Sequence, residues 1–210
     1  MKNKKYVKRS IKSVWHPCTQ MKHHEKLPLI PIERGKGVWL YDFEGKKYLD
    51  VTSSWWVNLF GHNNKIIKKY VNKQLNTLEH SMLAGLTHSP VIELSEKLSK
   101  LTKLGHCSYG SDGANAVEIA LKMSSHYWSQ TGFPKKKKYI YLENSYHGET
   151  LGALAVTDVP IFRTHYGALI KNYIKTESPD LRLKKSNQSV DDFLKAKLKK
   201  LQKIFEKHHS

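Results

Sequence analysis

The sequence predicts an α/β protein whose sheet is largely parallel. Two strand-like segments, 107–109 and 139–142, are each followed by a turn that contains glycine, and the first leads into a helix-like segment. Alternation of strands with helices favours a parallel sheet, because a helix is the usual crossover between parallel strands. With 210 residues, of which 39% are hydrophobic, the chain is long enough to bury a core.

The first half of the chain contains a hairpin and two helical patterns. Two short strand-like runs, 37–42 and 46–50, flank a glycine turn at 43–45, which predicts a β-hairpin. Apolar residues then follow helical spacing over 66–78 and again over 91–101. In the second helix Ser89 is a suitable N-cap and Pro90 suits the first helical position.

The second half continues the alternation. Apolar positions between 116 and 127 indicate a helix after the 107–109 strand, and 139–142 indicates the next strand. A last helix is expected over 190–205, where Ser189 and Asp192 form a capping box. We therefore expect an N-terminal segment with the hairpin over residues 1–60, followed by an α/β region over 61–210.

The chain is strongly basic, with 36 Lys+Arg against 18 Asp+Glu and a formal net charge of +18. This charge makes nucleic-acid binding one hypothesis. Nearly all of it is lysine, however, whereas proteins that recognise nucleic acid favour arginine forks. The lysines are spread over the polar faces of expected helices, with one run at 135–138. We interpret them mainly as solvated surface, and nucleic acid as an unfavoured partner.

Cysteine usage and the missing apolar segments exclude several classes. Cys18 and Cys107 are the only cysteines and form no CxxC pair, which argues against a zinc ribbon or a disulfide-rich secreted domain. The basic start, residues 1–12, is followed by no apolar signal segment, and no apolar run is long enough for a membrane span. The adjacent histidine pairs match no metal-ligand spacing. We expect a cytoplasmic protein with no membrane role and no metal.

One segment has the composition of a phosphate site. Residues 111–115, Ser-Asp-Gly-Ala-Asn, open the helix that follows, and backbone N–H groups at a helix N-terminus bind anions. Gly113 allows a close approach. The plainer alternative is an ordinary glycine turn capped by Ser111 or Asp112. The segment is neither a P-loop nor a GxGxxG motif.

Three aromatic residues are candidates for ligand contact. Trp55 and Trp56 follow the hairpin and are large enough to form the wall of a pocket for an apolar chain, although we expect one of them to pack in the core. Tyr146 lies just beyond the strand 139–142, at the edge where α/β sheets bind ligands, so its ring is placed to stack on a flat heterocycle. The alternative is a loop tyrosine with a satisfied hydroxyl.

A series of short motifs resembles a known family. In order they are Trp15-His16-Pro17, Ser53-Ser54-Trp55-Trp56, Gly61-His62, Thr87-His88-Ser89-Pro90, Gly113-Ala114-Asn115-Ala116-Val117-Glu118 and Ser145-Tyr146-His147-Gly148. The series resembles the class III aminotransferases that depend on pyridoxal phosphate. Within them it is closest to the branch that aminates 8-amino-7-oxononanoate in biotin biosynthesis, because the double tryptophan and Trp-His-Pro separate this branch from ornithine and 4-aminobutyrate aminotransferases.

The resemblance implies an incomplete fold-type I transferase that takes an amino group from S-adenosylmethionine and passes it to 8-amino-7-oxononanoate. Pyridoxal 5'-phosphate would carry the group. By position, Gly113 and Ala114 would hold the cofactor phosphate, Tyr146 would stack on the cofactor and contact substrate, and Trp55 would line the substrate channel. Family members are homodimers with active sites at the interface.

Two positions depart from the family pattern. Many members have serine where this chain has Ala114, and losing that hydroxyl removes a hydrogen bond to a charged phosphate worth about 1.5–3 kcal/mol. The family usually has a tyrosine where this chain has Cys18, and that tyrosine helps to recognise the keto substrate. Cysteine is smaller and a poorer donor, so recognition of the keto substrate is expected to differ.

No lysine in this chain stands in a motif resembling the one that bonds covalently to the cofactor. In the family that lysine, the aspartate beside the pyridine nitrogen and the substrate-binding arginine all lie beyond the point that matches Ser210. We therefore expect the N-terminal portion of an aminotransferase, inactive alone, with sheet edges and an apolar helix face left uncovered. The alternatives are a fragment of another class III ω-aminotransferase and a basic nucleic-acid-binding protein.

Overall fold

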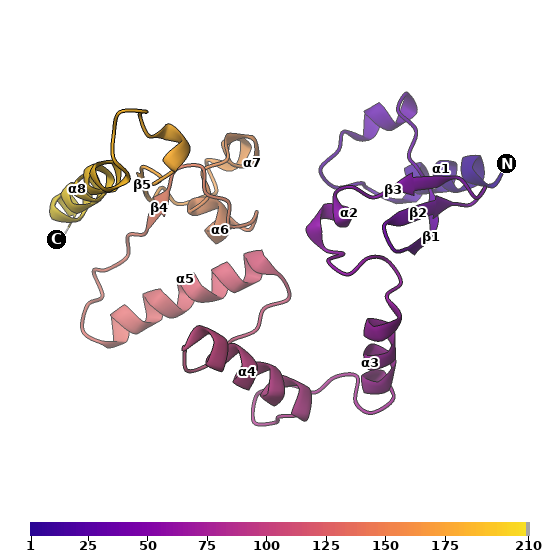
Figure 1. Cartoon of the computed structure of the whole chain (residues 1–210), viewed down its shortest axis with the longest axis horizontal. Coiled ribbons are helices and arrows are strands. Elements are labelled where there is room, and N and C mark those ends of the chain that lie inside the picture. Colours follow the sequence, from indigo (N-terminus) through magenta and orange to yellow (C-terminus); the bar gives the residue numbers. More distant parts are fainter. Residues whose placement is uncertain (209–210) are drawn as a thin grey trace. The chain divides into compact units, whose positions relative to one another are not determined.

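The computed structural model describes residues 1–208, and contacts within the chain divide it into two compact units, Met1–Ile92 and Glu93–Ser210. Figure 1 shows the helices and strands of both. The α/β class predicted from the sequence is confirmed. The division predicted at residue 60 is a boundary between domains, whereas the division after Ile92 separates units by their contacts. The domain boundary stays a prediction.

The first unit is built on a three-stranded antiparallel sheet with the strand order β1-β2-β3. The strands are β1 (Ile32–Lys36), β2 (Trp39–Asp42) and β3 (Lys47–Leu49). β2 and β3 are the predicted hairpin, paired in register from Trp39 with Leu49 to Tyr41 with Lys47. The sequence did not indicate β1 because its five residues, Ile-Glu-Arg-Gly-Lys, contain a single apolar side chain.

An N-terminal helix, α1 (Lys2–Ser13), packs on this sheet. Asn3 Nδ2 donates to the carboxylate of Asp42 at 2.9 Å, and the ring of Tyr6 stacks on Phe43 with centroids 3.9 Å apart. Asp42 is buried and also accepts a hydrogen bond from the hydroxyl of Tyr48. This helix was not expected from the sequence, because lysines dominate it. A 3₁₀ turn over Met21–Glu25 follows it along the chain.

Two further elements complete the first unit. Residues Ser53–Trp56 form a short turn, α2, and α3 (Lys65–Leu75) is the first helix predicted from apolar spacing. α3 begins where the side chain of Asn64 accepts the N–H groups of Ile66 and Ile67 at 2.9 and 3.1 Å. This cap fixes the start of the helix.

The second unit contains the parallel sheet. β4 (Ile140–Leu142) and β5 (Ile174–Thr176) run parallel and pair Ile140 with Ile174, so the predicted parallel arrangement is confirmed for these strands. The predicted helices are also present, as α4 (Ser89–Thr102), which crosses the boundary between the units, α5 (Gly113–Gln130) and α8 (Val190–His208). Short helical segments lie in the connections: α6 (Leu151–Ala155), α7 (Pro160–Arg163), and 3₁₀ turns at Thr164–Tyr166 and Leu181–Leu183.

The buried apolar residues of the second unit include most of α6. Ala153, Leu154 and Ala155 are almost completely buried, and Tyr141 of β4 and Phe193 of α8 are buried as well. α5 packs against α6, and α8 packs against β5, as Figure 1 shows. At the start of α8 the Ser189 hydroxyl accepts the N–H of Asp192 at 3.0 Å, which is one half of the predicted capping box.

One predicted strand is wrong. Residues 107–109 adopt no strand conformation, because they pair with no neighbouring strand within the described residues. They lie instead on α4, where the Tyr109 hydroxyl is 2.8 Å from Ser95 Oγ and the Cys107 thiol is 3.8 Å from the Ser95 carbonyl oxygen. An apolar run by itself supplies no ladder of hydrogen bonds, and the ladder is what defines a strand.

Several apolar helix faces are exposed, as the sequence led us to expect. α3 and α4 have no buried residue, and Phe193 is the one buried residue of α8. Ile66 and Tyr70 of α3 and Leu198 of α8 each keep more than half of their surface exposed. Helices with an apolar stripe normally bury it, so these faces are surfaces that a further protein layer would cover.

We predict that an ion-paired carboxylate makes the stability of the second unit depend on pH. Lys197 of α8 donates to Glu177 at 2.6 Å and Lys200 donates to its other oxygen, which together lower the pKa of Glu177 from 4.5 to about 2. Because the pKa is lower in the folded chain, the ionised carboxylate stabilises the fold fully at pH values above 4.5. This stabilisation is lost as the pH falls from 4.5 towards 2. The measurement is the urea midpoint of the chain against pH.

The matched control is Glu177→Gln, because other carboxylates titrate in the same range. The midpoint of the wild-type chain should exceed that of the variant near neutral pH, and the difference should close as pH falls from 4.5 to about 2. A difference that stays constant over this range would show that the two lysines do not stabilise the ionised carboxylate.

Candidate functional site

The N-terminal turn of α5 is the first part of the candidate site. Asp112 is the N-cap, and its carboxylate accepts the N–H of Asn115 at 2.9 Å. This hydrogen bond is the main cause that holds the pKa of Asp112 below its usual value. The capped glycine turn named as the plainer alternative is therefore confirmed.

Gly113 keeps the approach to this turn open. No heavy atom lies within 4 Å of the place where a side chain at Gly113 would begin. α5 is 18 residues long, so the positive end of its dipole adds to the N–H groups of its first turn. The turn thus presents N–H groups and the positive end of a helix, which favour an anion, whereas the capping carboxylate of Asp112 is itself an anion and would repel a phosphate.

The segment from Ser145 to Gly148 lies directly against this turn. A methyl group at Gly148 would overlap the side chain of Ala114 and lie 2.9 Å from its Cα, and Gly148 has a φ of +112°. Only glycine permits both the close approach and this backbone conformation. The structure therefore brings the predicted residues Gly113 and Ala114 close to the segment that carries Tyr146.

A second contact ties α5 to α6. The carboxylate of Glu118 accepts the N–H of Gly152 at 2.7 Å and that of Ala153 at 3.3 Å. Both amides belong to the first turn of α6, where no intrahelical acceptor exists. No role for Glu118 follows from the sequence, because the amides that it binds lie 34 and 35 residues further along the chain.

Tyr146 stands at the carboxyl end of β4, as predicted, with about half of its surface exposed. Its hydroxyl donates to Glu149 at 3.1 Å, and its ring lies 5.6 Å from the ring of Phe162. The backbone beside it is fixed, since the His147 N–H donates to the hydroxyl of the buried Thr157. A half-exposed ring on a fixed backbone suits stacking on a flat ligand.

The other two predicted residues belong to the first unit. Cys18 is exposed and has a φ of 57°, so its thiol is accessible. Trp55 and Trp56 are 59% and 80% exposed, so the expectation that one of them packs in the core is wrong for the described residues. Their rings meet edge to face with centroids 6.4 Å apart.

An acidic side chain that the sequence did not indicate supports this tryptophan segment. The carboxylate of Asp50 accepts three hydrogen bonds. The donors are the backbone N–H of Ser54 at 2.9 Å, the Ser54 hydroxyl at 2.7 Å and Nε2 of His62 at 2.8 Å. The backbone N–H of Ser54 is the largest cause that lowers the pKa of Asp50 to about 2, so this carboxylate is ionised at neutral pH.

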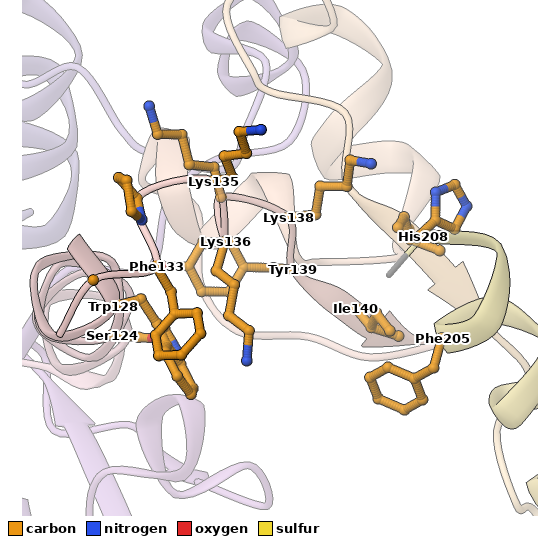
Figure 2. A pocket seen from close by; sticks show the side chains of 14 residues that line it. Ser124, Trp128, Phe133, Lys135, Lys136, Lys138, Tyr139, Ile140, Phe205 and His208 are labelled. Carbon is orange, nitrogen blue, oxygen red and sulfur yellow. The ribbon is translucent and has the colours of Figure 1, made fainter. Parts of the chain in front are cut away.

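A cavity in the second unit lies away from these residues. It has a volume of about 800 Å³ and is lined by aromatic and basic side chains, among them Trp128, Phe133, Phe205 and the run 135–138. Figure 2 shows these side chains around it, and Lys136 Nζ lies 3.6 Å from the centre of the Trp128 ring. None of the predicted cofactor or substrate residues lines it, so we do not assign the cofactor to this cavity.

The described residues contain neither a metal-binding cluster nor a membrane-spanning helix. No group of three or more His, Cys, Asp or Glu side chains is arranged to hold a metal ion there. Among the helices of residues 1–208, none is both long enough and apolar enough to span a membrane.

Comparison with known proteins decides the family. Residues 20–210 match the family model "Aminotransferase class-III". The chain belongs to the class III aminotransferases. This membership confirms the resemblance inferred from the motif series, and it agrees with the mixed helices and parallel strands of the structure.

Several curated relatives of this class III chain share one name. The chain is 43% identical over 196 residues to the adenosylmethionine-8-amino-7-oxononanoate aminotransferase of Helicobacter pylori. This match covers 93% of the chain and 43% of the relative. The chain is 46% identical over 171 residues to the Staphylococcus aureus protein of that name, covering 79% of this chain and 38% of the relative. The chain thus spans less than half the length of these relatives.

Solved structures agree with the family. The Methanocaldococcus jannaschii adenosylmethionine-8-amino-7-oxononanoate aminotransferase is 34% identical with a TM-score of 0.84, and the match covers 98% of this chain and 44% of that one. An ω-transaminase from Thermomicrobium roseum is 27% identical with a TM-score of 0.86, covering 97% and 46%. The expected fold-type I architecture of the pyridoxal-phosphate aminotransferases, present in part, is confirmed.

We predict that Gly148→Ala separates the two parts of the candidate site. The added methyl group would overlap Ala114 and would also hold a side chain at a φ of +112°. Overpacking and backbone strain together should lower the free energy of unfolding by about 2–4 kcal/mol. Chemical denaturation of the purified chain measures this loss.

Gly105→Ala is the control, because a side chain there would meet no atom within 4 Å and no unusual φ is involved. It should change the free energy of unfolding by less than about 1 kcal/mol. Equal losses in the two variants would contradict the close approach of Gly148 to Ala114.

Proposed function

We propose that this chain is the N-terminal portion of an adenosylmethionine-8-amino-7-oxononanoate aminotransferase. The observation that carries the proposal is its 40–46% identity to several curated proteins of that name, over most of its own length. The complete enzyme would transfer the amino group of S-adenosylmethionine to 8-amino-7-oxononanoate, giving 7,8-diaminononanoate. The Trp-His-Pro and double-tryptophan motifs support this branch over other class III enzymes.

The cofactor of this proposal is pyridoxal 5'-phosphate, which supplies the electron sink for amino-group transfer when it is bound. The backbone N–H groups of Gly113 and Ala114 would hold its phosphate at the N-terminus of α5. The exposed ring of Tyr146 would stack on its flat ring, and the Tyr146 hydroxyl would contact substrate. One structural neighbour, an ω-transaminase from Pseudomonas jessenii, is described as a complex with PMP.

Two residues of the proposed site set its expected differences from the family. Ala114 offers a backbone N–H without the hydroxyl of serine, so we propose weaker phosphate binding, by about 1.5–3 kcal/mol. Cys18 offers an exposed thiol in place of a phenol, so we propose altered contact with the keto substrate. Trp55 would line the substrate channel.

We propose two further features of the working protein. The exposed apolar faces of α3, α4 and α8 support a requirement for more protein surface, which a C-terminal portion, separately encoded or not, and a second copy of the enzyme would supply. The biosynthetic reaction supports a cytoplasmic location.

The second candidate function is that of another class III ω-aminotransferase, which the structural similarity to ω-transaminases favours. Their sequence identity of 27% is below the 34% of the Methanocaldococcus jannaschii enzyme. Binding of nucleic acid, suggested by the charge of +18, would show as an affinity that falls steeply with salt. We rank it last because the lysines are spread along the chain.

We predict that purified residues 1–210 have negligible transaminase activity, because no lysine among them stands in a motif resembling the one that bonds to the cofactor. Co-expression with the C-terminal portion of the Helicobacter pylori relative should restore transfer from S-adenosylmethionine to 8-amino-7-oxononanoate. The measurement is formation of 7,8-diaminononanoate, with the C-terminal portion alone as the control.

Turnover by residues 1–210 alone would refute the inactivity of this portion. A reconstituted complex that transfers amino groups from other amines but not from S-adenosylmethionine would favour the ω-aminotransferase alternative.

A further inference from the structure

The segment that carries the two tryptophans has an unusual backbone. Four consecutive residues, Ser53 to Trp56, have φ values of 49°, 47°, 68° and 64°. This is the left-handed region, which residues other than glycine occupy as single positions and rarely in a row. A turn of this kind forms only where its surroundings hold it.

The side chain of Asp50 holds the turn from its N-terminal side. It accepts both the backbone N–H and the hydroxyl of Ser54, at 2.9 and 2.7 Å. The Asp50 side chain is only 7% exposed, so water competes little for these hydrogen bonds. Ser54 is therefore held at the centre of the left-handed turn.

His62 in turn holds Asp50. Its Nε2 donates at 2.8 Å to Oδ2 of Asp50, the same oxygen that accepts the Ser54 hydroxyl. The backbone of His62 is itself fixed, because its N–H and carbonyl pair with Gly37 at 2.8 and 3.0 Å. Its ring fits over Gly35, where a methyl group would lie 2.7 Å from the Cβ and Cγ of His62.

Burial contributes little to fixing the two tryptophans within the described residues. Trp55 and Trp56 are mostly exposed, and the ring contact that the structure gives them is the edge-to-face contact with each other. The direction of both rings is thus set mainly by the backbone turn beneath them. The turn in turn depends on Asp50 and His62.

We propose that Asp50 and His62 are positioning residues for substrate recognition, which hold the left-handed turn Ser53–Trp56 and so present Trp55 and Trp56 as one apolar wall. The substrate class that fits this wall is an amine or ketone with an aliphatic chain, whose methylene groups would lie against the indole rings. This inference rests on the proposed function, which assigns Trp55 to the substrate channel.

The test uses the full chain and needs neither cofactor nor substrate. The two indole rings are 6.4 Å apart at an interplanar angle of 86°, close enough for their electronic transitions to couple, so we expect a paired band in the circular dichroism spectrum. Trp55→Phe gives the spectrum without this band. In His62→Ala the band should fall towards that of Trp55→Phe, while the helical signal remains.

Two more variants separate positioning from general stability. His62→Gln retains a side-chain N–H donor for Asp50 and should recover much of the band. Gly35→Ala leaves His62 and Asp50 in place chemically but pushes the imidazole ring, so it should weaken the band, whereas Gly105→Ala should not. In the reconstituted enzyme, His62→Ala should raise KM for the substrate with little change in kcat.

A wild-type band in a folded His62→Ala or Gly35→Ala chain would overturn the proposal. Loss of the helical signal in His62→Ala, His62→Gln and Gly35→Ala alike would also overturn it, because the pair would then support the whole unit and not this turn. The spectra stand apart from the proposed function. A chain that shows the expected spectra but gives no reconstituted turnover would count against the proposed function alone.

Discussion

The arrangement of the candidate site depends on one hydrogen-bonding group, the carboxylate of Glu118. This carboxylate of α5 accepts hydrogen bonds from the backbone N–H groups of Gly152 and Ala153 in α6. Neither N–H group has an acceptor within its own short helix. α6 is the best-buried helix of the second unit. Glu118 therefore ties α5 to the core, and the close approach of residue 148 to Ala114 is possible only because residue 148 is glycine.

The same logic appears on a smaller scale in the first unit. There Asp50 accepts a hydrogen bond from the backbone N–H of Ser54, which lies in a turn outside any β-ladder. His62 donates to the same carboxylate and holds it in place. In both units a carboxylate accepts hydrogen bonds from backbone N–H groups of an irregular or short helical turn, and predicted site residues nearby in the same unit are exposed. Tyr146 and Trp55 are exposed, so their positions come from backbone contacts rather than from burial.

Local patterns were enough to predict much of the fold. The hairpin, α3, α4, α5, β4 and α8 follow from apolar spacing and turn residues, and the position of Tyr146 follows from the end of β4. β1 and α1 were missed because charged residues dominate them and their stability comes from pairing with β2 and from the contacts of Asn3 and Tyr6. The strand at 107–109 was wrong because a strand requires a partner.

The candidate site was predictable only in part. Motifs indicated Gly113, Ala114, Trp55 and Cys18, but a motif shows neither Glu118 reaching α6 nor the four left-handed residues from Ser53 to Trp56. Such contacts join residues that are far apart in the chain or depend on a backbone conformation that the sequence does not favour. The exposure of both tryptophans likewise required the structure.

The most direct test of the central claim is amide hydrogen exchange in the Glu118→Ala chain, with Glu96→Ala on α4 as the control. If Glu118 holds α6 against α5, exchange at Gly152 and Ala153 should become faster in Glu118→Ala, and so should exchange at His147 in the segment that carries Tyr146. Glu96→Ala should leave all three amides as in the wild type. Unchanged protection at Gly152 and Ala153 in Glu118→Ala would contradict the account.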